Sequence, residues 1–144
     1  LCVATPEYLT RHGTPAHPND LNRHTCLTLS SDASQTRGWA FSVPHGDAQE
    51  IMHLRPSGPL DCSDGQVLHA WCLSGLGLAW RSTWEVHEDL SAGRLVSVLD
   101  EFAAPANGVY VVLPQRKHLP LRLRLWIDFL REAFARPNFG LPRV

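Results

Sequence analysis

One local construction recurs along the chain and constrains the fold more than any other feature. A short apolar stretch ends in a small polar residue, and a helical pattern begins directly after it: LCVAT leads into PEYL, PLDC into SDGQ, and GLAW into RSTW. Such apolar stretches are typical of buried strands, and Ser, Thr or Asp before a helical pattern is typical of a helix N-cap. Strands that alternate with helices predict an α/β fold with a mixed, mostly parallel sheet flanked by helices.

The same patterns give the expected bounds of the elements. Strands are predicted over residues 1–5, 26–30, 39–43, 50–56, 59–62, 77–80, 94–99 and 108–114, and helices over 6–12, 65–74, 83–93 and 121–135. In the last helix the apolar residues recur at helical spacing on one face, while Arg122, Arg131 and Glu132 occupy the opposite face. That helix is therefore expected to pack one side against other parts of a protein.

Composition excludes several classes of function. The 144 residues include 13 basic and 14 acidic ones, and this balance argues against a nucleic-acid surface, which needs clustered Lys and Arg. The four cysteines form no C-x-x-C pair and stand within apolar stretches, which favours buried free thiols and a cytoplasmic location. The eight histidines are scattered, and His87-Glu88 is not followed by a second His at metalloprotease spacing, so neither a metal nor a cofactor is expected.

Gly75-Leu76-Gly77 resembles part of a dinucleotide-binding turn, but its context differs. That turn follows a strand and opens a helix, whereas here the glycines follow a helix and precede a strand. Gly75 is therefore expected to cap the helix, and Gly77 to let the strand pass close to its neighbour. Ser74 lacks the strand–turn–helix setting of a hydrolase nucleophile, and His69 lies on the same helix, so no nucleophile–base pair predicts an enzyme.

The turn at Ser63-Asp64-Gly65 combines a strand end with a helix start. Free backbone N–H groups at a helix start can bind an anion, although simple capping by Ser63 or Asp64 explains the turn equally well. The construction recurs at Thr5-Pro6 and Arg81-Ser82, and Ser30-Ser31 also end a strand. In an open α/β sheet such strand ends line one crevice, so these segments predict a binding site for a small polar or carboxylate ligand, without catalysis.

The chain also resembles a known family over nearly its whole length and in the same order. PEYLTRHGTP matches a P-x-Y-L-x-x-H-G-x-P helix and turn, and PNDLNRHTCL matches P-x-D-L-x-x-H-x-C-L. Further matches are SDGQVLHAWCLSGLGLAW, DLSAGRLVSVL, YVVLPQRKHLP and LRLWIDFLREAF. This ordered set resembles the effector-binding domain of LysR-type transcriptional regulators, beginning at its second subdomain.

The resemblance implies a lobe like those of periplasmic binding proteins. Residues 1–107 would form the second effector-binding subdomain, and residues 108–144 would supply the returning strand and C-terminal helix of the first. Residues 1–5 and 109–113 would lie near the two crossings between the lobes. DNA would be bound only through an N-terminal domain absent from this chain. A free solute-binding protein of the same fold type, acting in transport, is the alternative function.

The resemblance also assigns a site and an interface. A small-molecule effector, expected to carry a carboxylate, would bind between the lobes, and its contacts would be Thr5, Pro6, Ser30, Ser31, Cys62, Ser63 and Ser82. The helix from Gln66 to Ser74 is apolar nearly all round, which is typical of a core helix or of a core helix that also meets another subunit. By resemblance it is the dimer-forming helix of a homodimer or tetramer, with Val67, Leu68 and Trp71 at the interface.

Overall fold

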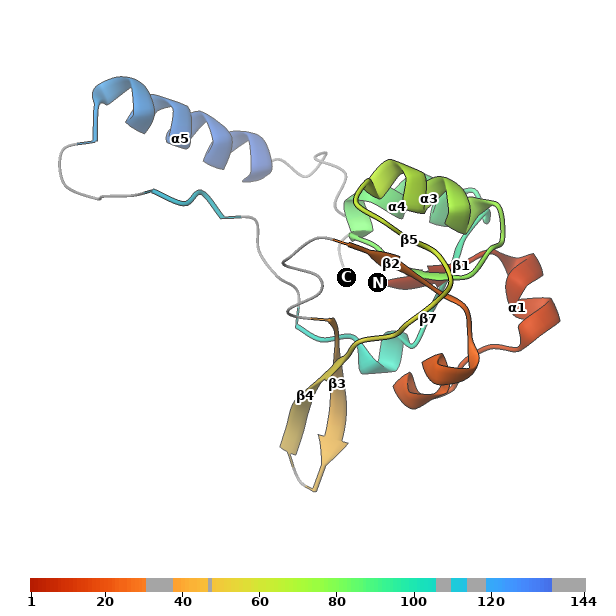
Figure 1. Ribbon diagram of the computed structural model, residues 1–144. Coiled ribbons are helices and arrows are strands. Elements are labelled where there is room, and N and C mark those ends of the chain that lie inside the picture. The colour runs from red at the N-terminus through yellow and green to blue at the C-terminus, as the bar shows by residue number, and fades with distance from the viewer. Residues whose placement is uncertain (31–37, 47, 106–109, 114–118, 136–144) are drawn as a thin grey trace. The chain divides into compact units, whose positions relative to one another are not determined.

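The computed structural model describes residues 1–30, 38–46, 48–105, 110–113 and 119–135 (Figure 1). The chain divides into two compact units, Leu1–Pro105 and Ala106–Val144, and each is described by itself below. The assignment of these units to two subdomains of an effector-binding domain stays a prediction.

The first unit is built on a five-stranded sheet. Its order is β5 (Asp61–Cys62), β2 (Cys26–Leu29), β6 (Leu78–Trp80), β1 (Cys2–Ala4) and β7 (Val96–Val98). β2 pairs in parallel with β5 and β6, whereas β1 pairs antiparallel with β6 and β7. β5, β2, β6 and β7 therefore share one direction, and β1 alone runs against them. The predicted mixed α/β sheet is confirmed, and within it strand direction is mostly parallel.

The helices begin and end close to the predicted residues. They are α1 (Pro6–His12), α3 (Gly65–Leu73) and α4 (Thr83–Ser91). Two short 3₁₀ helices, η1 (Pro18–Arg23) and η2 (Asp100–Phe102), lie in the connections. At the end of α3 the Leu76 N–H donates to Trp71 O at 3.2 Å and the Gly75 N–H donates to Cys72 O at 2.9 Å, with Gly75 at φ 71°. This is the Schellman arrangement, so the predicted capping role of Gly75 is confirmed.

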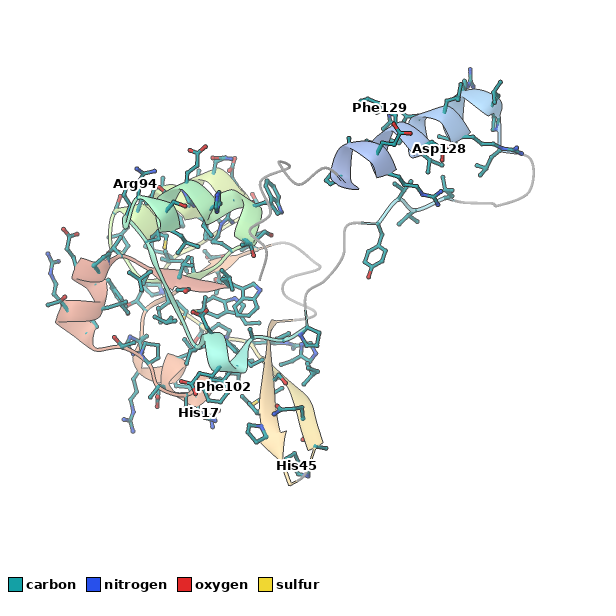
Figure 2. All side chains as sticks on the ribbon, turned by 180° about the vertical axis from the view of Figure 1, so that it is seen from behind. His17, His45, Arg94, Phe102, Asp128 and Phe129 are labelled. Atoms are coloured by element: carbon teal, nitrogen blue, oxygen red, sulfur yellow. The ribbon has the colours of Figure 1, made fainter. Side chains whose placement is uncertain are left out.

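Both faces of the sheet are covered, because side chains alternate along each strand. Val3 and Ala79 face α3 and α4, while Cys2, Ala4 and Leu78 face α1 and η1. The first face buries Val3, Leu27, Leu68, Cys72, Ala79, Val86 and Leu95. The second buries Cys2, Ala4, Tyr8, Leu21, Cys26, Trp39, Phe41, Leu78, Val98 and Leu99. On this second face the rings of His17 and Phe102 meet edge to face at 5.1 Å, which joins η1 to η2 (Figure 2).

Within the first unit, a two-stranded hairpin extends away from the five-stranded sheet (Figure 1). β3 (Trp39–His45) pairs antiparallel with β4 (Ala48–Leu54), so both strands reach further into the predicted turn than expected. Its base is anchored by aromatic contacts, since Trp39 stacks on Trp80 at 5.7 Å and Phe41 meets the same ring edge to face at 5.0 Å. Its far end is exposed.

In the second unit, α5 (Leu121–Ala135) has the predicted bounds. The strand predicted over residues 108–114 is wrong for its described part, because Tyr110–Leu113 have no strand structure. A strand needs a neighbour for its backbone hydrogen bonds. Among the described residues, this segment has instead the side chains of α5 beside it, and Tyr110 and Val112 are 80 % and 88 % exposed. None of the described helices is long and apolar enough to cross a membrane.

Candidate functional site

The ends of β2, β5 and β6 meet at one edge of the sheet, which we call the strand-end edge (Ser30, Asp61–Asp64, Arg81 and Ser82). Leu29 pairs with Cys62 and Leu27 pairs with Ala79 in the two parallel ladders. Continuing both registers places Ser30 level with Ser63 on one side and with Ser82 on the other. Four predicted effector contacts, namely Ser30, Cys62, Ser63 and Ser82, are thus brought to one edge.

Ser30 and Cys62 are held by local hydrogen bonds. The Ser30 N–H donates to Cys62 O at 2.7 Å, and the Ser30 hydroxyl donates to the Asp61 carboxylate. The Cys62 thiol donates to Asp64 O at 3.2 Å. These bonds hold both side chains in place at the strand-end edge.

Asp64, rather than Ser63, caps α3. Its Oδ1 accepts the Gln66 N–H at 2.7 Å and the Val67 N–H at 3.3 Å. Ser63 is exposed, and its hydroxyl has no partner within the described part of the chain. Because capping is already provided by its neighbour, the Ser63 hydroxyl is available to a ligand.

Thr5 and Pro6 do not join this edge, so the expected convergence of all strand ends is wrong for them. β1 runs against the other strands, and its register with β6 pairs Val3 with Ala79, which carries Thr5 toward the start of β6. There Thr5 is buried and its hydroxyl accepts the Tyr8 N–H at 3.3 Å as the N-cap of α1. Pro6 is the first residue of that helix. Ser31 lies outside the described residues.

The sequence interpretation named the Arg81-Ser82 segment but gave Arg81 no role of its own, and it overlooked Glu85; both residues lie at the same edge. Arg81 is only 6 % exposed, and its Nη2 donates to Glu85 Oε1 at 3.0 Å. Glu85 Oε2 accepts the Ser82 N–H at 3.1 Å, so one carboxylate holds the guanidinium and the start of α4 together. The available signal was a charged residue directly after the apolar strand LGLAW, four positions before a Glu.

The cysteines behave as predicted: all four are free thiols, and three of them are buried. Burial raises the pKa of Cys26 to about 12, and it raises the pKa of Cys72 to about 12 as well. Thiols with such pKa values stay protonated at neutral pH, so neither of these two side chains is a nucleophile.

The polar cluster between α3 and α4 contains no nucleophile. His69 Nε2 and Asp89 Oδ2 are 2.8 Å apart, and Arg94 Nε donates to Asp89 Oδ1 at 2.5 Å. This network ties the two helices together through one buried carboxylate. In the described ranges, no group of three or more His, Cys, Asp and Glu side chains could hold a metal ion.

The predicted dimer residues divide into two kinds. Leu68 is 1 % exposed and packs in the core between α3 and the sheet, so its prediction as an interface residue is wrong. Val67 is 41 % exposed, and Trp71 is half-buried against the same core. Of the three predicted interface residues, only Val67 and Trp71 have surface open to a partner.

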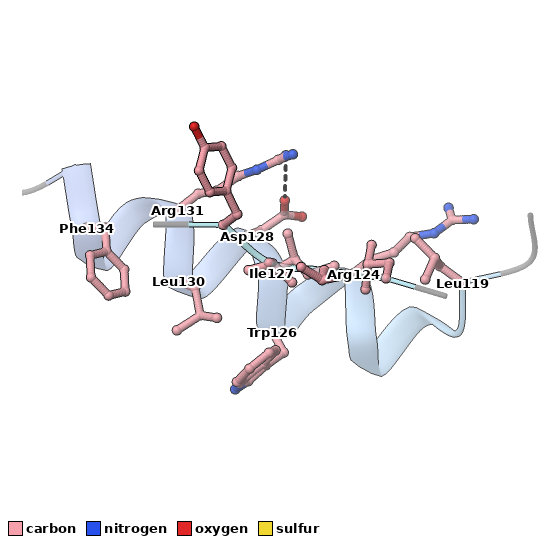
Figure 3. Close-up of a pocket in the computed structure, with 12 residues that line it drawn as sticks. Leu119, Arg124, Trp126, Ile127, Asp128, Leu130, Arg131 and Phe134 are labelled. Carbon is pink, nitrogen blue, oxygen red and sulfur yellow. Dashed lines mark ion pairs between the residues drawn. The ribbon is translucent and has the colours of Figure 1, made fainter. Parts of the chain in front are cut away.

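The second unit contains an open groove of about 1440 Å³ (Figure 3). Its walls are α5 and the segment Tyr110–Leu113, and an ion pair between Asp128 and Arg131 at 3.7 Å lies at its side. The lining is mainly apolar: Tyr110, Val111, Val112, Leu113, Leu119, Arg124, Trp126, Ile127, Asp128, Leu130, Arg131 and Phe134. A continuous apolar lining of this kind is typical of a surface that packs against protein.

Comparison with known proteins identifies the family. Residues 1–135 match the LysR substrate binding domain. The chain belongs to this family. It is an effector-binding regulatory domain of the LysR type, with an α/β fold that solved regulatory domains share.

Named relatives of this LysR-type domain are transcriptional regulators. The chain is 39 % identical to the HTH-type transcriptional regulator DmlR of Escherichia coli over 144 residues, covering 98 % of this chain and 45 % of that protein. It is 36 % identical to the HTH-type transcriptional regulator CrgA of Neisseria meningitidis over 137 residues, covering 92 % and 43 %. The chain therefore spans less than half the length of these relatives. These relatives favour regulation over the transport alternative and over an enzyme.

Solved structures agree with the LysR-type fold. The regulatory domain of CrgA from Neisseria meningitidis superposes with a TM-score of 0.66 at 30 % identity, over 91 % of this chain and 62 % of that one. Full-length AphB, a Vibrio cholerae virulence activator, gives 0.67 at 26 % identity, over 92 % and 44 %.

Proposed function

We propose that the strand-end edge is one wall of an effector site in a LysR-type transcriptional regulator. The observation that carries this proposal is the meeting of Ser30, Ser63 and Ser82 from three separate strand ends at one level of the sheet. Small hydroxyl side chains beside helix starts suit a small polar ligand, because they offer donors and acceptors without filling the space.

The second unit would belong to the first effector-binding subdomain in this proposal. α5 and Tyr110–Leu113 carry apolar side chains that remain exposed, among them Leu125, Trp126 and Phe129. The rest of the first subdomain would cover them. The effector would act through a difference in affinity between an open and a closed arrangement of the lobes.

The proposal includes three partners: an effector, a second copy of the chain and DNA. The effector is a small metabolite that carries a carboxylate. A second copy of the chain would meet the flank of α3 that contains Val67 and Trp71, giving a homodimer or a tetramer. DNA would be contacted through a separate helix-turn-helix domain of the whole cytoplasmic regulator.

A metabolite screen read by thermal shift tests the proposal, because a ligand that binds only the folded state raises its Tm. A compound that raises the Tm of the chain should lose most of this effect in Ser63→Ala. Ser91→Ala is the matched control, since Ser91 is an exposed serine at the far end of α4. Equal responses of the two variants to every active compound would place the ligand elsewhere and refute the proposed site.

A further inference from the structure

Arg81 is a buried cation at an unusual position, next to the starts of two helices. Its guanidinium lies against the first residue of α3, because a Cβ added at Gly65 would be 3.3 Å from Nη1 and 3.4 Å from Nη2. Arg81 also directly precedes Ser82, the N-cap of α4. The N-terminus of a helix carries partial positive charge, so these three positive features repel one another unless anions lie among them.

The anions present are already engaged. Asp64 accepts two backbone N–H groups of α3, and the Asp61 carboxylate accepts the Ser30 hydroxyl. Glu85 divides its two oxygens between Arg81 Nη2 and the Ser82 N–H. One carboxylate is therefore shared between a buried guanidinium and the start of a helix.

Arg81 has donor capacity left over. Among the described residues, its buried Nε has no hydrogen-bond partner, and its Nη1 donates no hydrogen bond either. A buried donor without a partner costs free energy, and it costs more on a charged group. A planar guanidinium with free donors is suited to a carboxylate, which accepts two parallel N–H groups.

We infer that Arg81 anchors a carboxylate group of the effector at the start of α3. The inference rests on the proposed sensing function and names the ligand class for that site: a small organic acid. The carboxylate would take the Arg81 donors that Glu85 leaves free, and it would compensate the positive starts of α3 and α4. Because Gly65 has no Cβ, it does not crowd Nη1, which a Cβ would meet at 3.3 Å.

Titration of the ¹⁵N-labelled full chain with succinate tests the inference, with succinamide as the uncharged analogue. The backbone amides of Gly65, Val67 and Ser82 and the Arg81 Nε–H signal should shift to saturation with succinate and stay in place with succinamide. In Arg81→Gln the affinity for succinate should fall about tenfold or more, the size expected for a charge-assisted hydrogen bond.

Two further variants separate ligand binding from a structural role. Glu85→Gln keeps an acceptor for the Ser82 N–H but removes the competing charge, so succinate should bind several-fold more tightly. Gly65→Ala places a methyl group beside Nη1 at a helical position where Ala is well tolerated, so affinity should fall while the Tm is kept. Glu88→Gln, which like Glu85→Gln changes a carboxylate of α4, is the control, and its affinity for succinate should match that of the unmodified chain.

Three results would overturn the inference: the same affinity in Arg81→Gln, weaker binding in Glu85→Gln, or no saturable shift of these amides with succinate. The sensing proposal fails separately. Neutral metabolites that shift Ser30, Ser63 and Ser82 equally in the unmodified chain and in Arg81→Gln would retain the site and remove only its carboxylate anchor. A metabolite that stabilises the chain without shifting this edge would instead refute the site itself.

Discussion

Substitution of Gly77 by Ala tests whether the Gly-Leu-Gly segment serves packing rather than a ligand. A Cβ at Gly77 would lie 2.4 Å from Thr25 O and 3.1 Å from Thr25 Cγ2. The closest atom, Thr25 O, belongs to the backbone, and it also accepts the Leu78 N–H at 2.9 Å. To relieve this clash, β6 would have to move away from the segment before β2. Overpacking of a core costs about 1–3 kcal/mol, and an obstacle of backbone atoms favours the upper end of that range, about 3 kcal/mol.

Gly93→Ala provides the matched control. Gly93 has φ 68° and no atom within 4 Å of the added Cβ, so its substitution carries only the cost of the left-handed backbone, about 1 kcal/mol. Urea unfolding of each variant, followed by the near-ultraviolet circular dichroism of the stacked Trp39 and Trp80, measures both free energies. If Gly77→Ala is no more destabilising than Gly93→Ala and instead abolishes ligand binding, the packing interpretation is refuted.

Three further predictions concern single side chains. Asp64→Ala should lower the free energy of unfolding by about 1 kcal/mol through loss of the α3 cap, whereas Ser63→Ala should leave the Tm nearly unchanged and weaken effector binding; a large loss of stability in Ser63→Ala would show that it is a structural residue. Burial, followed by the charge of His12, lowers the pKa of His24 below 6.5, so stability should be complete above pH 6.5 and should decline as the pH falls toward the lowered pKa; His24→Gln should flatten this part of the pH profile, and an unchanged profile would contradict the assignment. Leu68→Ala should cost about 2–5 kcal/mol of stability, whereas Val67→Glu should change stability little and reduce self-association in sedimentation experiments. If neither variant reduces self-association, α3 is not part of the interface.

The His24 prediction has a simple structural cause. The Tyr8 hydroxyl accepts the Thr25 N–H at 2.9 Å and lies 3.3 Å from His24 Nδ1. Burial opposes the charge of a protonated His24 ring, and the charge of His12 opposes it as well, so the folded state binds the proton less readily than the unfolded state does.

Local sequence patterns predicted the elements well because their causes are local. α5 has the predicted bounds because its apolar spacing is strict, and Asp64 and Gly75 bracket α3 through hydrogen bonds within a few residues. The strand direction of β1 was not predictable in this way, because it depends on pairing with β6 and β7, which are distant in sequence. The error in placing Thr5 and Pro6 follows from that single reversal.

Helix faces were harder to predict where the apolar pattern is uniform. α3 has almost no polar side, so the sequence alone did not distinguish the core residue Leu68 from the exposed Val67. Arg81 was given no role of its own for a related reason. A charged residue at a strand end is usually solvated, and only the packing of α3 against the edge shows that this one is buried.

The reversal of β1 also connects the proposed site to the proposed crossing between lobes. Because β1 alone starts at the strand-end edge, Leu1 lies beside Arg81: the Arg81 N–H donates to Leu1 O at 2.8 Å, and the Leu1 nitrogen donates to Arg81 O at 2.7 Å. At the same level, the buried residue Leu99 is held at φ 63°. This left-handed conformation costs free energy for any residue other than glycine. A ligand that binds the Arg81 side chain would thus contact a residue whose backbone is hydrogen-bonded to Leu1, the residue directly before β1. If residues 1–5 form a crossing between the lobes, a ligand on Arg81 would bind directly beside the segment where a change of lobe orientation begins. Coupling between the ligand and the lobes would then need no extended chain of contacts.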